Sequence, residues 1–169
     1  RSGANKNTVD IINRATPLYA QAYFEFDAKK SFGITKSHLR FAERPIRSSY
    51  FVRRADVVAC HNQTYVDRYA MADELKEGGS FLLSCGWKPE ELGLRLPAAL
   101  KRTLAQKKAR LWIIDAPALA QELGLGRHTN IILQAAFFRL AGDLPGFVPL
   151  DKAEALMQGS MHLPQTVTF

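Results

Sequence analysis

Three short apolar runs recur through the middle of the chain: ADVVAC at residues 55–60, SFLLSC at 80–85 and RLWIID at 110–115. A helical pattern follows each run, at 63–79, 97–109 and 116–123. Apolar runs of this length that alternate with helices are typical of a parallel sheet covered on both faces. The sequence therefore predicts an α/β domain with an open, mostly parallel sheet and helices on both faces.

The segments on either side of this region carry different patterns. Residues 18–27 and 37–43 alternate apolar with polar positions, which predicts two strands with one buried face each, and residues 3–14 read as a helix. Residues 130–141 are apolar nearly all round, which predicts a deeply buried helix. A doubly wound, Rossmann- or flavodoxin-like fold normally begins with a strand and a glycine-rich phosphate loop. We therefore expect the first strand of this three-layer fold to be missing from this chain.

The composition changes again near the C-terminus. From Gly142 onward the chain is rich in Pro and Gly, and residues 150–157 hold a last amphipathic turn or two before a loose end. This pattern predicts a domain at 1–149, followed at 150–169 by a short helix and a tail or linker.

Composition excludes several classes of protein. The chain has 169 residues, 47% hydrophobic and 23% charged, which is the balance of a soluble globular domain. No apolar run approaches the roughly 20 residues that cross a bilayer. Two cysteines, Cys60 and Cys85, cannot by themselves hold a tetrahedral zinc or an iron–sulfur cluster. We expect a cytoplasmic protein with reduced thiols, no metal site and no membrane partner.

The net charge of +7 favours an anionic partner: nucleic acid, an acidic protein surface or a phosphorylated cofactor. Two groups of basic residues stand out. The first falls among turns and short strands, where side chains are presented to ligands, and comprises Lys29, Lys30, Lys36, Arg40, Arg44, Arg47, Arg53 and Arg54. The second follows a predicted helix and comprises Lys101, Arg102, Lys107, Lys108 and Arg110.

Local chemistry marks three candidate sites. The sequence Lys29-Lys30-Ser31 places two ammonium groups and a hydroxyl beside Gly33, which suits a phosphate or pyrophosphate, although such a turn is often merely solvated. Asn130 opens the buried helix, where it caps the helix or meets a ligand. His61 and Asn62 follow a predicted central strand at the carboxyl edge that carries ligands in open α/β sheets.

The common catalytic signatures are absent from the sequence. The chain contains no GxSxG, HExxH, P-loop or CxxC motif. It also lacks a motif that reads DNA or RNA, so nucleic-acid binding rests on charge alone and is a minor alternative. No residue of this chain is therefore named as catalytic from a motif.

Five segments, in a fixed order, resemble one family: GANKN, YAQAYFEFDAKKSFGITKSHLRF, RPIRSSYFVRRADVVACHN, KEGGSFLL and TNIILQAAFF. They are similar to the gamma domain (domain III) of pyruvate:ferredoxin (flavodoxin) oxidoreductases, which are 2-oxoacid oxidoreductases. The resemblance runs from Gly3 to about Leu144. Ordered motifs of this length are far more specific than any short pattern.

The resemblance implies a function for the whole enzyme and a smaller one for this domain. Such enzymes decarboxylate a 2-oxoacid oxidatively to acyl-coenzyme A and pass electrons to ferredoxin or flavodoxin. Thiamine diphosphate, Mg²⁺ and the [4Fe-4S] clusters are then expected in other domains or subunits, with which this one packs. The gamma domain itself helps to bind coenzyme A. The family positions carried over to this chain are Lys30, Ser31 and Asn130.

An alternative function stays open. Phe32 stands where the family usually has a glycine, and similar domains occur fused to sulfite reductase flavoproteins. The chain would then be a gamma-like docking module of another redox enzyme, with no coenzyme A site.

Overall fold

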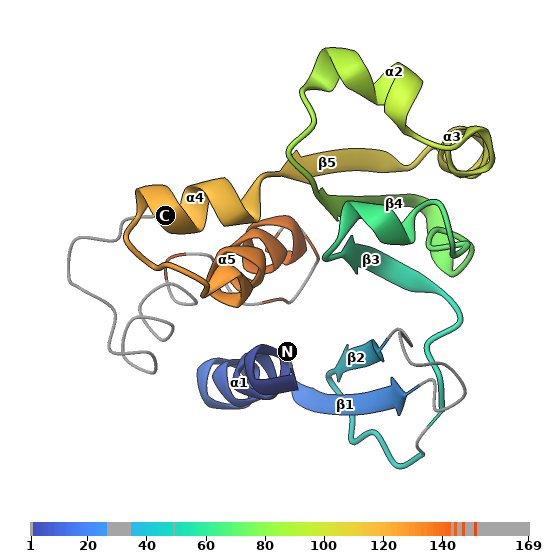
Figure 1. Cartoon of the computed structure of the whole chain (residues 1–169). Coiled ribbons are helices and arrows are strands. Elements are labelled where there is room, and N and C mark those ends of the chain that lie inside the picture. Colours follow the sequence, from blue (N-terminus) through green and yellow to red (C-terminus); the bar gives the residue numbers. More distant parts are fainter. Residues whose placement is uncertain are drawn as a thin grey trace. The chain divides into compact units, whose positions relative to one another are not determined.

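The computed structural model describes residues 2–26, 35–48 and 50–142, together with 144, 147 and 151; the side chains of 2–5 and 26 are excluded. The chain forms two compact units (Figure 1). We call residues 1–52 with 141–169 the hairpin unit and residues 53–140 the sheet unit. Each unit is described by itself.

The hairpin unit is built on one helix and two strands. Helix α1 (Ser2–Ala15) precedes β1 (Tyr19–Phe26) and β2 (Thr35–Ala42), and the two strands pair antiparallel from Tyr19 opposite Ala42 to Phe26 opposite Thr35. These elements match the helix and the two alternating strands predicted from the sequence.

One face of the hairpin is apolar. Alternation places Ala22 opposite Leu39 and Ala20 opposite Phe41 on this face. Helix α1 contacts both strands and buries Ile11 and Ile12. Phe41 also meets Phe147 edge to face, with ring centroids 5.3 Å apart.

The sheet unit contains a parallel three-stranded sheet. Strands β3 (Ala55–Cys60), β4 (Leu75–Ser84) and β5 (Arg110–Ile114) lie in the order β3-β4-β5, and both pairings are parallel. The three apolar runs thus form the three strands. The chain is a mixed α/β protein with a parallel sheet, as the sequence predicts.

The core of the sheet unit lies against one face of this sheet. Phe81 and Leu83 of β4 are fully buried there. They pack in one cluster with Leu75 at the start of β4 and with residues before and after this strand, which are Cys60, Val66, Ala72, Cys85, Leu96, Leu100 and Leu104. Leu82 is buried on the opposite face. Burial of β4 on both faces explains its continuous apolar sequence.

Four helices and two 3-10 turns complete the sheet unit. The turns are η1 (Gln63–Tyr65) and η2 (Pro89–Glu91), and the helices are α2 (Leu92–Arg95), α3 (Ala98–Gln106), α4 (Ala116–Glu122) and α5 (Thr129–Ala141), the last ending at the unit boundary. Helices α3, α4 and α5 correspond to helices predicted from the sequence.

The predicted helix at 63–79 is wrong. Only the single turn η1 forms there, turns continue to Glu74, and β4 begins at Leu75. Leu75 pairs with Ala55 of β3, so Gly78 and Gly79 lie inside a strand and do not end a helix. Strand pairing across the sheet outweighs the local amphipathic pattern.

The C-terminal part of the prediction is untested. Apart from Asp151, residues 150–169 lie outside the described residues, so the predicted short helix and tail stay a prediction. No helix in the described part of the chain combines the length and apolar character that a bilayer span needs.

Candidate functional site

Asn130 lies in the first turn of α5. The turn before it is set by two glycines with positive φ, Gly124 at 70° and Gly126 at 57°, a region that glycine enters without steric cost. The N–H of Leu125 donates to the carbonyl of Ala120 at 2.7 Å, which ends α4 and redirects the chain. Thr129 and Asn130 are therefore helical residues and not the residues before the helix.

The side chain of Asn130 is half-buried and makes no hydrogen bond with another described residue. Its amide group therefore does not cap α5, although capping was the simpler interpretation of the sequence. The free N–H groups of a helix's first turn carry partial positive charge. Arg127 and His128, both exposed, precede this turn. The start of α5 can therefore accept an anion.

Lys30 and Ser31 lie outside the described residues, as do Lys29, Phe32 and Gly33. Segment 27–34 joins the paired ends of β1 and β2, Phe26 and Thr35. The structure therefore tests neither residue.

The carboxyl edge of the parallel sheet holds His61 and Asn62. β3 is an edge strand of the described three-stranded sheet, and β4 is the central one, so the expectation that these residues follow a central strand is wrong. The side-chain oxygen of Asn62 accepts from the N–H and the hydroxyl of Thr64, each at 3.0 Å. Asn62 thus caps η1, which is a structural role.

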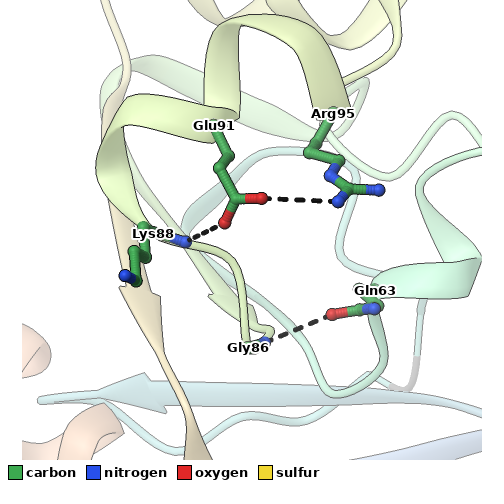
Figure 2. A network of polar contacts seen from close by, with 5 residues as sticks. All are labelled: Gln63, Gly86, Lys88, Glu91 and Arg95. Atoms are coloured by element: carbon green, nitrogen blue, oxygen red, sulfur yellow. Dashed lines mark hydrogen bonds and ion pairs between the residues drawn. The ribbon is translucent and has the colours of Figure 1, made fainter.

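The neighbouring polar groups at this edge also bind backbone. Figure 2 shows the side-chain oxygen of Gln63 accepting from the N–H of Gly86, at 3.3 Å. Asp115 accepts from the N–H of Ala118 at 3.0 Å and so caps α4. A Cβ on Gly86 would lie 3.2 Å from the other oxygen of Asp115. These contacts fix the ends of β3, β4 and β5 relative to one another.

Both thiols are buried in the core of the sheet unit and reduced. Burial raises the pKa of Cys60 above its usual 9.0, and the Sγ atom donates to the carbonyl of Asn62 at 3.2 Å. Burial likewise raises the pKa of Cys85, with a smaller contribution from Asp115. A raised pKa lowers the thiolate fraction, so neither is suited to act as a nucleophile.

A second network joins Lys88, Glu91 and Arg95 at the surface (Figure 2). The carboxylate of Glu91 accepts from the backbone N–H of Lys88 at 2.9 Å and from Arg95 at 3.3 Å. Both contacts, the first more strongly, lower the pKa of Glu91 below 4.5. The network therefore favours the fold above the ordinary pKa of glutamate and loses that effect as the pH falls through the lowered value.

Three lysines of the second basic group form hydrogen bonds or an ion pair within the sheet unit. The ammonium of Lys107 donates to the carbonyls of Ala72, Asp73 and Leu75. Lys101 donates to the carbonyl of Gly93 at 2.7 Å, and Lys108 pairs with Glu77 at 3.2 Å. This pattern argues against a continuous cationic surface for nucleic acid on α3.

Comparison with known proteins identifies the family. The pyruvate ferredoxin/flavodoxin oxidoreductase family matches residues 3–161. The chain belongs to this family. It is 48% identical over 159 residues to the pyruvate:ferredoxin oxidoreductase of Moorella thermoacetica, and 53% identical over 156 residues to the pyruvate-flavodoxin oxidoreductase of Klebsiella pneumoniae. These matches cover 94% and 92% of the chain but only 13% of each relative.

Two solved structures share the fold of this oxidoreductase-family chain. One is a pyruvate oxidoreductase subunit from Thermotoga maritima, with a TM-score of 0.59 and 17% identity over 93% of the chain and 85% of that subunit. The other is the gamma subunit of a keto/oxoacid ferredoxin oxidoreductase from Geobacter sulfurreducens, with a TM-score of 0.61 and 15% identity over 93% of the chain and 77% of that subunit. The resemblance to pyruvate:ferredoxin (flavodoxin) oxidoreductases stated from the motifs is therefore confirmed by the family match, and these two structures show the fold.

Sequence reasoning missed the roles of Gln63 and Asp115 at the carboxyl edge of the sheet. Asp115 follows an apolar run and precedes Ala-Pro, which is the pattern of a helix cap and could have been recognised. The contact of Gln63 with Gly86 joins residues far apart in sequence and leaves no local signal.

Proposed function

We propose that this chain is the coenzyme A-binding and assembly domain of a pyruvate (2-oxoacid):ferredoxin or flavodoxin oxidoreductase. The whole enzyme decarboxylates a 2-oxoacid oxidatively to acyl-coenzyme A, and ferredoxin or flavodoxin receives the electrons. The relatives named above support this proposal. Nearly all of this chain aligns with them, but it spans only about an eighth of their length, as one domain of a larger enzyme would.

The observation that carries the coenzyme A role is the start of α5. A half-buried amide with no hydrogen bond to the described residues, in a helix's first turn, suits a phosphorylated ligand. In this proposal Asn130 binds coenzyme A there, and Lys30 and Ser31 contribute an ammonium and a hydroxyl to its phosphates.

The remaining chemistry belongs elsewhere in the enzyme. No group of three or more His, Cys, Asp or Glu in the described part of the chain is placed to hold a metal ion. Thiamine diphosphate, Mg²⁺ and the [4Fe-4S] clusters would be held by other domains or subunits. The domain then acts by binding and positioning, and it supplies no catalytic residue. A cytoplasmic location also stays a prediction.

The test uses the full-length enzyme and two pairs of variants. We expect Lys30→Ala and Asn130→Ala each to weaken coenzyme A binding by roughly 10- to 100-fold, the loss of a hydrogen bond that involves a charged group. Lys88→Ala and Asn13→Ala are matched controls, since both side chains are exposed and neither is proposed to bind the ligand. Isothermal titration with coenzyme A measures the affinity, and the rate of 2-oxoacid decarboxylation should change little.

Unchanged affinity in both test variants would contradict the coenzyme A role. The docking module, which Phe32 favours, would then be the better description. An effect of the same size in the controls would indicate a general loss of structure.

A further inference from the structure

The polar face of the β1–β2 hairpin is covered by the segment that follows β2. Arg40 of β2 donates to the carbonyl of Ser48 at 2.6 Å and to the side chain of Gln21, and its guanidinium lies 3.7 Å from the ring centroid of Tyr50. His38 accepts from the N–H of Val52 through Nδ1 at 3.2 Å. Ser48, Tyr50 and Val52 are thus contacted by two side chains of β2.

His38 itself is buried, although it lies on the polar face of the hairpin, opposite Tyr23. It is 7% exposed, because Phe51 packs on it with ring centroids 5.3 Å apart. Its other ring nitrogen lies 3.4 Å from the carboxylate of Glu25. Phe51 also meets Tyr23 edge to face at 5.2 Å.

This arrangement leaves an aromatic surface exposed to solvent. Tyr50 is 60% exposed, and Phe51, Tyr23 and Tyr19 are each more than 40% exposed. These four are a majority of the seven exposed large apolar residues of the described chain, and all belong to the hairpin unit. We call Tyr19, Tyr23, Tyr50 and Phe51 the aromatic patch. Clustered exposed rings mark an interaction surface.

The segment that carries Tyr50 and Phe51 is also cationic. Arg44 and Arg47 are exposed, and neither makes a hydrogen bond or ion pair with another described residue. The segment from 43 to 52 holds these two arginines and a single carboxylate, Glu43. Three lysines in and just after α3, by contrast, bind their own unit: Lys101, Lys107 and Lys108. Arg44 and Arg47 are therefore available to carboxylates of a partner.

Tyrosine and arginine are the residues that most often anchor protein–protein interfaces. A nucleic-acid surface would instead offer open ring faces for base stacking. Here the rings of Phe51 and Tyr23 meet edge to face, and one face of Tyr50 is covered by Arg40. The surface therefore fits a protein partner that carries carboxylates around an apolar centre.

We propose that the aromatic patch, with Arg44 and Arg47, docks onto an acidic surface of another domain of the same oxidoreductase. The family match supplies the source of that partner, because about seven-eighths of each relative lies outside this chain. The proposal rests on the proposed function only in taking the chain to be one domain of such an enzyme. It does not depend on coenzyme A binding.

The test places a photo-cross-linking residue, p-benzoylphenylalanine, at position 50 of the full-length enzyme. This residue keeps an aromatic ring at an exposed site. We expect cross-links to peptides of another domain that contain Asp or Glu. The same residue at Leu94, which is 93% exposed on α2, measures background capture.

A charge reversal tests the electrostatic part. We expect Arg47→Glu to lower the yield of this cross-link by about tenfold, since a like charge then faces the acidic surface. Arg102→Glu is the matched control, an exposed arginine on α3, and should leave the yield unchanged. Coenzyme A titration of the same variants distinguishes a failure of the docking proposal from a failure of the proposed function. If only the docking proposal fails, the affinity for coenzyme A is unchanged.

Four results would overturn the proposal: no cross-link above the Leu94 background, a cross-link to residues 53–140 of this chain, one to a second copy of the enzyme, or one to nucleic acid. An equal loss of yield in Arg47→Glu and Arg102→Glu would also contradict it.

Discussion

At the scale of single residues, two glycines of the sheet unit differ in the space around them. A Cβ on Gly79 of β4 would lie 2.8 Å from a methyl group of Leu75 and 3.0 Å from the carbonyl oxygen of Asp56. A Cβ on Gly93 of α2 would meet nothing within 4 Å. Gly79 is therefore required by close approach of the neighbouring backbone, and Gly93 is not.

We expect Gly79→Ala to lower the free energy of opening of β4 by about 1–3 kcal/mol, because the carbonyl of Asp56 must move. Gly93→Ala should be neutral or stabilise α2 by less than about 1 kcal/mol, since alanine restricts the unfolded chain. Hydrogen exchange of peptides from the full-length enzyme measures both. Equal protection of β4 in the two variants would show that the strand accommodates a methyl group.

At the scale of elements, the sequence predicted most of the fold. The three apolar runs became β3, β4 and β5, and the alternating segments became β1 and β2. The failure at 63–79 has a tertiary cause. The ammonium of Lys107, just after α3, donates hydrogen bonds to the carbonyls of Ala72, Asp73 and Leu75. Leu75 also pairs with Ala55 of β3. Contacts between residues twenty or more positions apart leave no trace in local periodicity.

The candidate site likewise has features that local sequence patterns predict and features that depend on distant contacts. The position of Asn130 at the start of a buried helix was predictable from apolar periodicity. Its lack of a capping bond was not, because that depends on the glycine turn at Gly124 and Gly126. The burial of His38 was not predictable either, because it depends on contacts with Phe51 and Val52, which follow β2 in the chain.

The role of Lys107 can be tested against the lysine beside it. We expect Lys107→Met to destabilise the turn before β4 by about 1–3 kcal/mol, since three backbone carbonyls, two of them in part-buried hydrogen bonds, lose a charged donor. Lys108→Met should change stability by less than about 0.5 kcal/mol, because its ion pair with Glu77 is exposed. Hydrogen exchange of peptides from 66–79 reports the difference. A similarly small effect of both substitutions would mean that the ammonium of Lys107 does not stabilise this turn.

At the scale of the whole molecule, the core of the sheet unit should open as one cooperative body. Cys60 and Cys85 lie in one cluster with Phe81, and both thiols have raised pKa values because they are buried. In the closed state each thiol is shielded and largely protonated at neutral pH, so alkylation proceeds through molecules in which the core has opened. Alkylation rates of the two thiols therefore report how often that happens.

We expect Phe81→Ala, which removes a fully buried ring, to cost about 3–5 kcal/mol and to raise the alkylation rates of both thiols by at least about 100-fold. Leu94→Ala, at a side chain that is almost fully exposed, should change neither rate. Peptide mass spectrometry of the full-length enzyme after timed alkylation measures each thiol separately. If the core opens as one body, the two rates rise by the same factor; a rise at Cys85 alone would show that the carboxyl edge of the sheet opens independently of the strands beneath it.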